Sequence, residues 1–243
     1  MNTPTALPLR TARFSRRRVF ALAAGAFLLA TACAAPPPRP PEPGHAHDHA
    51  QGPLVHRFEH AEQWAPEFDD PARDAWQRPK DVVGSMHIAS GMTVADLGAG
   101  TGYFEPYLSR AVGTSGTVLA VDIEPDMVRY LRERAARDHL DNVRPLLAGV
   151  DDPKLPAHGI DRVLILNTWH HIPAHAAYLP KLAAGLAPGG TITIVEFTMD
   201  SPHGPPREHR IAPEALIAEL QASGRKAERV DVTLPYQYVV VAR

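Results

Sequence analysis

Cysteine is almost absent from this chain of 243 residues, which contains one, Cys33. A single cysteine cannot build a disulfide framework, and it excludes a zinc or iron–sulfur site made of several thiolates. The rest of the composition, 44% hydrophobic and 21% charged, is that of an ordinary globular protein with one domain or two small ones.

A strong net charge is lacking as well, at −2 for the whole chain. Residues 1–32 hold five arginines and no acidic residue, which leaves 20 basic against 27 acidic residues in the remainder. A mildly acidic body is a poor partner for the phosphate backbone of nucleic acids. We therefore expect no nucleic-acid partner.

The N-terminal hydrophobic run is too short for a membrane-spanning helix, which needs about 20 apolar residues. It follows three consecutive arginines and covers the 14 uncharged residues 19–32, as in a signal peptide. Residues 17–20 (R-R-V-F) resemble the twin-arginine export signal, and residues 29–33 resemble a bacterial lipobox, with Ala30 where leucine is usual.

The lipobox resemblance implies cleavage before Cys33 and a lipid on its sulfur. We therefore expect an exported, membrane-anchored lipoprotein that faces the periplasm and touches the membrane only through this lipid. The alternative is an uncleaved N-terminal anchor with the protein facing the cytoplasm.

The chain is expected to have three parts: a signal peptide (1–32), a linker (33–53) and one folded domain (54–243). Six prolines between positions 36 and 43 favour an extended linker that cannot bury a core. Alternate histidines in an extended segment could bind a transition metal weakly, but nothing rigid holds them together. We expect no metal site here; the histidines are His45, His47 and His49.

Strands and helices alternate through most of the domain. Apolar or β-branched runs predict strands at 92–97, 117–121, 143–148, 161–167, 191–197, about 229–233 and 237–241. Helical spacing, with Pro at several starts and Gly beyond several ends, predicts helices at 79–89, 103–112, 125–139, 174–186 and 213–222. The alternation predicts an α/β fold with a doubly wound, mostly parallel sheet. The short connection between the last two strands makes them antiparallel.

A glycine-rich segment, D-L-G-A-G-T-G at 96–102, lies where the first expected strand turns into a helix. Doubly wound folds bind nucleotides at this position, where glycines let the backbone approach a ligand. Asp122 ends the second strand, where a carboxylate reaches ribose hydroxyls. The dinucleotide fingerprint lacks its third glycine, and a P-loop lacks its lysine. Asp96 would repel a pyrophosphate but would attract a sulfonium or an amino group.

This segment resembles motif I of class I S-adenosylmethionine (SAM)-dependent methyltransferases, and L-A-P-G-G at 186–190 resembles a turn of the same family. The resemblance covers most of residues 80–243. It implies a Rossmann-like sheet of seven strands with an antiparallel last strand, and SAM as the cofactor. It also implies that the cofactor is bound by Asp96, Gly98, Gly100, Gly102, Tyr103, Asp122, Ile123, Asn167 and one of the neighbours Asp151 and Asp152. Because Val150 replaces the usual glycine, either of these two aspartates fits the contact with the adenine amino group.

Asn167 ends the fourth strand, so residues 168–171 (T-W-H-H) should line the mouth of the acceptor site. They also resemble a bacterial subgroup of these enzymes whose substrate is unknown. Methyl transfer needs a base when the acceptor must lose a proton, and histidine accepts protons near neutral pH. His170 and His171 are therefore the candidate catalytic residues. The alternative is that one caps the next helix and the other packs beneath it.

Further candidates surround this mouth. Glu196 ends the fifth strand and either orients an acceptor or pairs with Arg207 or Arg210. Those two arginines belong to a loop that is either a lid for an anionic acceptor or an ordinary solvated loop. Arg73 and Trp76 either cover the cofactor or pack in the core.

The sequence thus predicts a SAM-dependent methyltransferase that acts on a small-molecule acceptor, which it does not identify. SAM is made in the cytoplasm, whereas the N-terminus carries an export signal. The alternative is therefore an exported lipoprotein that retains the fold as a non-catalytic SAM-binding or ligand-binding module.

Overall fold

The computed structural model describes residues 57–243. The expected signal peptide and linker, with their lipobox and three histidines, lie outside the described residues. Within residues 57–243, no helix is long and apolar enough to cross a membrane.

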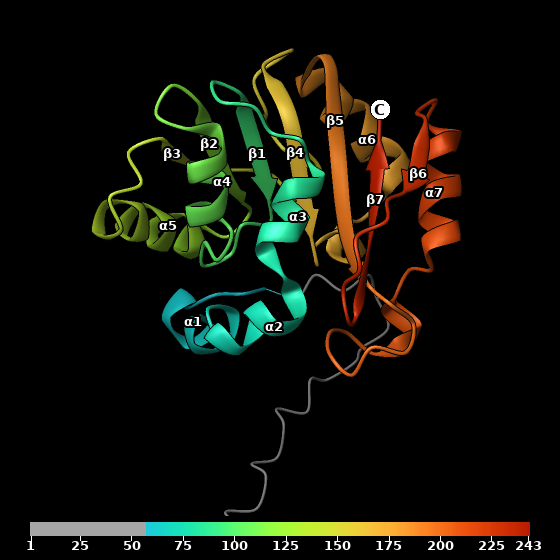
Figure 1. Ribbon diagram of the computed structural model, residues 1–243, viewed down its shortest axis with the longest axis horizontal. Coiled ribbons are helices and arrows are strands. Elements are labelled where there is room, and N and C mark those ends of the chain that lie inside the picture. Colours follow the sequence, from blue (N-terminus) through green and yellow to red (C-terminus); the bar gives the residue numbers. More distant parts are fainter. Residues whose placement is uncertain (1–56) are drawn as a thin grey trace, which may run out of the picture. The chain divides into compact units, whose positions relative to one another are not determined.

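Seven strands form one sheet in the order β3-β2-β1-β4-β5-β7-β6 (Figure 1). The first five strands in this order are parallel to one another, and β7 is antiparallel to both β5 and β6. This confirms the expected doubly wound sheet with an antiparallel last strand. The strands are β1 (Thr93–Leu97), β2 (Thr117–Asp122), β3 (Val143–Leu147), β4 (Ile160–Leu166), β5 (Leu186–Phe197), β6 (Ala227–Arg229) and β7 (Gln237–Ala242).

Helices cover both faces of this sheet. Side chains of α3 (Pro79–Ser85), α4 (Glu105–Val112) and α5 (Pro125–Arg137) share one buried cluster with residues of β1 and β2. Side chains of α6 (His175–Gly185) and α7 (Pro213–Ala222) share the other with residues of β4, β5 and β7. The strands between the two layers are therefore apolar on both faces, as the sequence of the fourth strand indicated.

Local sequence accounts for the longest of these helices. α5 begins with a proline, whose fixed φ suits the first turn, and carries Asp126 near its start. Arg134 and Arg137 lie in its last turn, where positive charge interacts favourably with the helix dipole. Met127 and Leu131 are buried, one turn apart on the face that covers the sheet.

Several boundaries differ from the sequence prediction. β5 begins at Leu186 rather than at 191, because Leu186 pairs with Ile160 and a register shift accommodates the Pro-Gly-Gly segment. α4 begins at Glu105, two residues late, since the positive-φ glycine loop continues to Gly102. β6 covers Ala227–Arg229 instead of 229–233, so a longer connection than expected leads to β7.

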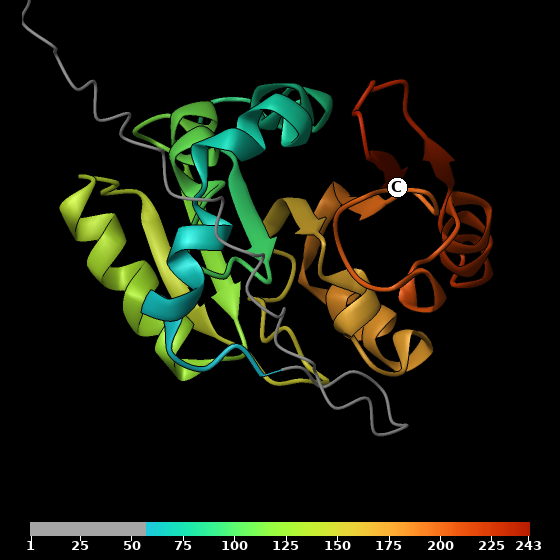
Figure 2. The same cartoon turned by 90° about the horizontal axis from the view of Figure 1, so that it is seen from below.

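Three short helical segments precede α3 in the described residues: α1 (Ala61–Phe68), the 3-10 turn η1 (Pro71–Arg73) and α2 (Asp74–Gln77). Figures 1 and 2 place α1 and α2 at one end of the sheet, beyond the carboxyl ends of the parallel strands. We call residues 57–77 the N-terminal cover. Two further 3-10 turns, η2 (Trp169–His171) and η3 (Arg207–His209), follow β4 and β5.

Candidate active site

The candidate site lies at the carboxyl edge of the parallel strands, where open α/β sheets bind ligands. The glycine loop leaves β1 there. Its three glycines have positive φ: 78° at Gly98, 56° at Gly100 and 90° at Gly102. A Cβ at position 98 would lie 2.9 Å from the Cβ of Thr168, so β1 and the segment after β4 approach this closely only at glycine.

Asp122 ties this loop to β2. Its Oδ2 accepts a hydrogen bond of 2.9 Å from the Gly100 N–H, and its Oδ1 accepts one of 2.9 Å from the Glu124 N–H. Burial raises the pKa of Asp122, whereas these N–H donors lower it. Each carboxylate oxygen has a further lone pair, so Asp122 can still accept a hydrogen bond from a ligand hydroxyl.

Two more carboxyl groups lie beneath the loop. Asp96 is 4% exposed, and burial followed by the nearby charge of Asp122 raises its pKa to about 7. Burial, then the charge of Asp96, also raises the pKa of Glu105 well above its usual value. Both oxygens of Glu105 are buried without a hydrogen-bond partner in residues 57–243. A cation above the loop would lower the free energy of these ionised groups.

An apolar surface lies beside these carboxyl groups. Among residues 57–243, three large hydrophobic side chains are exposed: Ile123 at 38%, Leu147 at 42% and Val150 at 43%. They follow or end β2 and β3, so all three lie at the same edge of the sheet. Clustered exposed apolar groups indicate a binding surface, and these suit a flat apolar ring.

The two candidate aspartates beyond β3 have different surroundings. The Asp151 carboxylate pairs with Lys181 of α6 at 3.0 Å, and its side chain is 83% exposed. The Asp152 Oδ1 accepts a hydrogen bond of 2.8 Å from the Lys154 N–H. Asp151 and Asp152 are the two residues after Val150, so both are close in the chain to the apolar surface.

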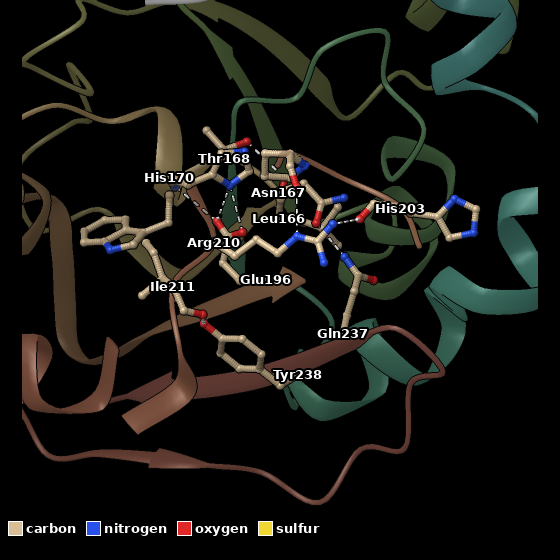
Figure 3. A network of polar contacts seen from close by, with 12 residues as sticks. Leu166, Asn167, Thr168, His170, Glu196, His203, Arg210, Ile211, Gln237 and Tyr238 are labelled. Atoms are coloured by element: carbon tan, nitrogen blue, oxygen red, sulfur yellow. Dashed lines mark hydrogen bonds and ion pairs between the residues drawn. The ribbon is translucent and has the colours of Figure 1, made fainter. Parts of the chain in front are cut away.

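His170 forms a buried pair with Glu196, and the two side chains are 3% and 2% exposed. The His170 Nδ1 lies 2.8 and 3.0 Å from the two Glu196 oxygens. The backbone N–H of His170 also donates to Glu196 Oε1, at 3.2 Å. Figure 3 shows the imidazole directed at the carboxylate. This geometry joins the ends of β4 and β5 and fixes which ring nitrogen faces the acid.

Neither candidate histidine caps the next helix. The N-cap of α6 is Ala174, without a side-chain hydrogen bond. The ring of His171 packs 4.1 Å from that of His170 and meets the edge of Phe58 at 5.7 Å. Helix capping, one part of the structural alternative, is therefore wrong for both residues.

The arginines of the loop after β5 do not pair with Glu196. The Arg210 guanidinium donates to carbonyl oxygens of this loop: Thr198, Met199, Ser201, His203 and Pro205. Arg207 also donates to the Met199 carbonyl, at 2.7 Å. Both arginines therefore stabilise the loop through its own carbonyl groups. The partner of Glu196 is His170.

A series of amides leads from the N-terminal cover into the site. Gln237, 1% exposed at the start of β7, donates to the Asn167 Oδ1 at 2.5 Å (Figure 3) and accepts from Gln77. The Gln77 Oε1 in turn accepts from Arg73, at 3.1 Å. Because a guanidinium can only donate, it fixes the orientation of both glutamines. Asn167 therefore presents its NH₂ group, and not its oxygen, to the rest of the site.

The N-terminal cover reaches from the end of β2 to the end of β4. The Phe68 ring would lie 3.5 Å from a Cβ at Gly100, directly against the loop. Ionic and capping contacts attach the cover to α5 and its approach: Arg57–Glu124 at 3.0 Å, Ala61 N–H to Asp126 at 2.6 Å, Glu62–Arg129 at 2.6 Å and Asp69–Arg134 at 2.6 Å.

The other end of the cover meets the acceptor side. Trp76 stacks on His203 at 4.8 Å and lies 6.1 Å from Phe197, between ring centroids. The Arg73 guanidinium lies 4.1 Å over the ring of Tyr103, directly after the glycine loop. Arg73 and Trp76 therefore belong to a cover over the site, one of the two expected alternatives.

Sequence patterns missed three of these residues. Gln77 and Gln237 had no assigned role, although a glutamine at the start of an apolar strand is a signal in itself. Glu105 was also missed, because a carboxylate in the first turn of a helix is ordinary. Its burial without a partner is visible only in the structure.

Comparison with known proteins identifies this arrangement. A family model described as a methyltransferase domain matches residues 94–190. An uncharacterized methyltransferase of Mycobacterium tuberculosis is 31% identical over 166 residues, covering 68% of this chain and 61% of that protein. A ubiquinone/menaquinone biosynthesis C-methyltransferase of Pasteurella multocida is 31% identical over 124 residues, covering 51% of this chain and 46% of that protein.

A solved structure agrees. The crystal structure of a SAM-dependent methyltransferase from Aquifex aeolicus is 28% identical, covers 76% of this chain and 98% of that one, and superposes with a TM-score of 0.71. The fold and the glycine loop thus define a methyltransferase domain. The chain belongs to the class I SAM-dependent methyltransferases, whose cofactor is SAM. It spans 61% of the length of the mycobacterial relative.

The described residues fit this cofactor. Positive φ and the short distance to Thr168 require glycine at position 98, and exposed apolar side chains that suit an adenine ring end or follow β2 and β3. The buried acids Asp96 and Glu105 match a ligand that carries a sulfonium and an ammonium group.

Proposed function

We propose that this protein transfers a methyl group from SAM to a small-molecule acceptor. The glycine loop, Asp122 and Ile123 would hold the adenosine part, and Asp96 would interact with the positive charges of the cofactor. SAM supplies a methyl group activated by its sulfonium. The chain would then hold the acceptor in line with the methyl group, exclude water with its N-terminal cover, and accept the proton that the acceptor loses.

The buried pair of His170 and Glu196 is the observation that supports a proton-accepting step in this proposal. With Nδ1–H donated to the carboxylate, the Nε2 atom holds the lone pair. No hydrogen bond from residues 57–243 occupies this Nε2. It can take the proton that a hydroxyl, thiol or activated carbon acid loses as that atom gains the methyl group. Glu196 then stabilises the imidazolium, and S-adenosylhomocysteine leaves.

Binding is the first test. Full-length protein is titrated with SAM by calorimetry, alongside Asp122→Asn and the control Asp141→Asn, which changes an acid outside the site. We expect Asp122→Asn to weaken SAM binding about tenfold or more, because it removes a charge-assisted acceptor. Failure of the folded wild-type protein to bind SAM would refute the proposal.

Turnover is the second test. Candidate acceptors with an ionisable hydroxyl or thiol are screened by the release of S-adenosylhomocysteine. With an acceptor that turns over, His170→Asn should lose about 100-fold or more in kcat while SAM affinity is retained. His139→Asn, outside the site, is the control. At most one S-adenosylhomocysteine per protein, with every acceptor tried, would favour the non-catalytic binding module.

We also propose that the protein is exported and anchored through a lipid on Cys33. The support is the sequence at 17–20 and 29–33, which lies outside the described residues. Mass spectrometry of the native N-terminus is the test. A lipid-modified Cys33 as the first residue is expected, whereas an intact N-terminus would contradict export as a lipoprotein.

A further inference from the structure

Arg73 ends η1 in the N-terminal cover and lies against the glycine loop. Its guanidinium stacks 4.1 Å over the ring of Tyr103, the residue after Gly102. One of its terminal nitrogens donates to the carbonyl of Phe68, whose ring faces Gly100. The other donates to Gln77 at 3.1 Å. Arg73 is thus positioned over the loop by its neighbours on both sides.

Among residues 57–243, no carboxylate forms an ion pair with the positive charge of Arg73. Arg57, Arg129 and Arg134 of the same region each form one. The Nε of Arg73 is buried and lacks a hydrogen-bond partner in that part of the chain. A buried cation left in this state is unfavourable until an anion joins it.

Within residues 57–243, the nearby acids do not pair with Arg73. Burial lowers the pKa of Arg73, and the acids Asp69, Glu67 and Asp74 only partly oppose this effect. Asp69 is engaged with Arg134 and with the Thr101 hydroxyl, at 2.6 and 2.8 Å. Asp74 accepts from the hydroxyl of Tyr103. Asp69 and Asp74 therefore have other partners among residues 57–243.

The cofactor carries a suitable anion. With its adenine ring on the exposed apolar side chains Ile123, Leu147 and Val150, SAM would run its amino-acid arm along the loop toward β1 and β4. That arm ends in one carboxylate and one ammonium group. The buried acids Asp96 and Glu105 flank the loop in the chain, and Arg73 stacks on Tyr103 directly after it. An amino-acid zwitterion therefore finds a partner for each of its charges.

We propose that Arg73 binds the carboxylate of the amino-acid arm of SAM, and so closes the N-terminal cover over the cofactor. This inference rests on the proposed function, because it concerns the same ligand. It assigns a binding residue to a segment that precedes the residues matched by the family model. It also predicts that Arg73 does not increase the affinity for a cofactor that lacks the carboxylate.

The experiment compares SAM with decarboxylated SAM by calorimetry on the full-length protein. We expect Arg73→Gln to weaken SAM binding about tenfold or more, the usual size for a lost charge-assisted contact. Decarboxylated SAM should bind the variant and the wild type within about threefold of each other. Arg73→Lys keeps the charge without the fork of donors, so it should recover part of the SAM affinity.

Two matched variants separate this role from a general effect on the cover. Arg129→Gln loosens the attachment of α1 to α5 without touching Arg73, and it should weaken both ligands by the same factor. Arg78→Gln, on the far side of the cover, should change neither. If Arg73→Gln weakens both ligands equally, or neither, the inference is overturned. If wild-type protein does not bind SAM, the proposed function fails instead.

Discussion

Replacing Asp96 by asparagine should change how the stability of the cofactor-free protein depends on pH. Asp96 is 4% exposed, and burial, helped by the charge of Asp122, raises its pKa to about 7. In an unfolded chain an aspartate has a pKa of about 3.9. Between these two values the folded state binds more protons than the unfolded state, so the stability of the wild-type protein falls as pH rises.

The size of the effect follows from the two pKa values. Each unit of difference corresponds to about 1.4 kcal/mol. At pH 5 the raised pKa of Asp96 costs the folded state about 1 to 2 kcal/mol, and at pH 8 it costs about 4 kcal/mol. Asparagine does not titrate. The free energy of unfolding of Asp96→Asn, relative to wild type, should therefore increase by about 2 to 3 kcal/mol from pH 5 to pH 8.

Urea unfolding without cofactor, followed by tryptophan fluorescence at pH 5, 6, 7 and 8, measures this difference. Asp141→Asn, outside the site, should run parallel to the wild type. A constant difference between Asp96→Asn and wild type across this range would refute the reasoning. The same substitution should weaken SAM binding, since it removes the negative charge beneath the loop, so stability and binding change in opposite directions.

Three further substitutions test other parts of the site. Gly98→Ala should lower the free energy of unfolding by about 3 kcal/mol, because the new Cβ adds a clash to a backbone with positive φ. Gly189→Ala also has positive φ but lies in open space, so it should cost about 1 kcal/mol. Urea unfolding of both variants measures the two costs. Glu196→Gln puts an amide N–H against the His170 Nδ1 and moves the ring proton to Nε2, so turnover should fall about 100-fold while calorimetry finds SAM affinity unchanged. Gln237→Leu leaves the side chains of Gln77 and Asn167 without their hydrogen-bond partner, so it should lower the free energy of unfolding by about 2 kcal/mol. A cost below about 0.5 kcal/mol would contradict the amide series.

The sequence predicted the sheet because its signals are local. Most of the apolar strands, such as β4, are followed by a helix, and this alternation leaves few possible sheet topologies. The motif at 96–102 locates the turn after the first strand. Boundaries were less accurate where distant pairing decides them. Leu186 belongs to β5 because Ile160 pairs with it, and nothing near Leu186 in the sequence reveals this.

Side-chain partnerships were harder to predict than the sheet. On sequence alone, Glu196 was expected to orient an acceptor or to pair with Arg207 or Arg210, and its pairing with His170 was not foreseen. The choice depends on the loop after β5, whose own carbonyl groups occupy Arg210. Gln237 meets Gln77 only because the N-terminal cover crosses the edge of the sheet, 160 residues away in the chain.

The amide series gives the cover a second function besides excluding water. Since Arg73 can only donate hydrogen bonds, it determines the orientation of Gln77, then of Gln237, and finally of Asn167. Any movement of Arg73 toward a bound carboxylate would act on the NH₂ group that Asn167 presents at the end of β4. The cover and the strand ends therefore form one polar unit, so binding at the glycine loop and the arrangement beside His170 should change together.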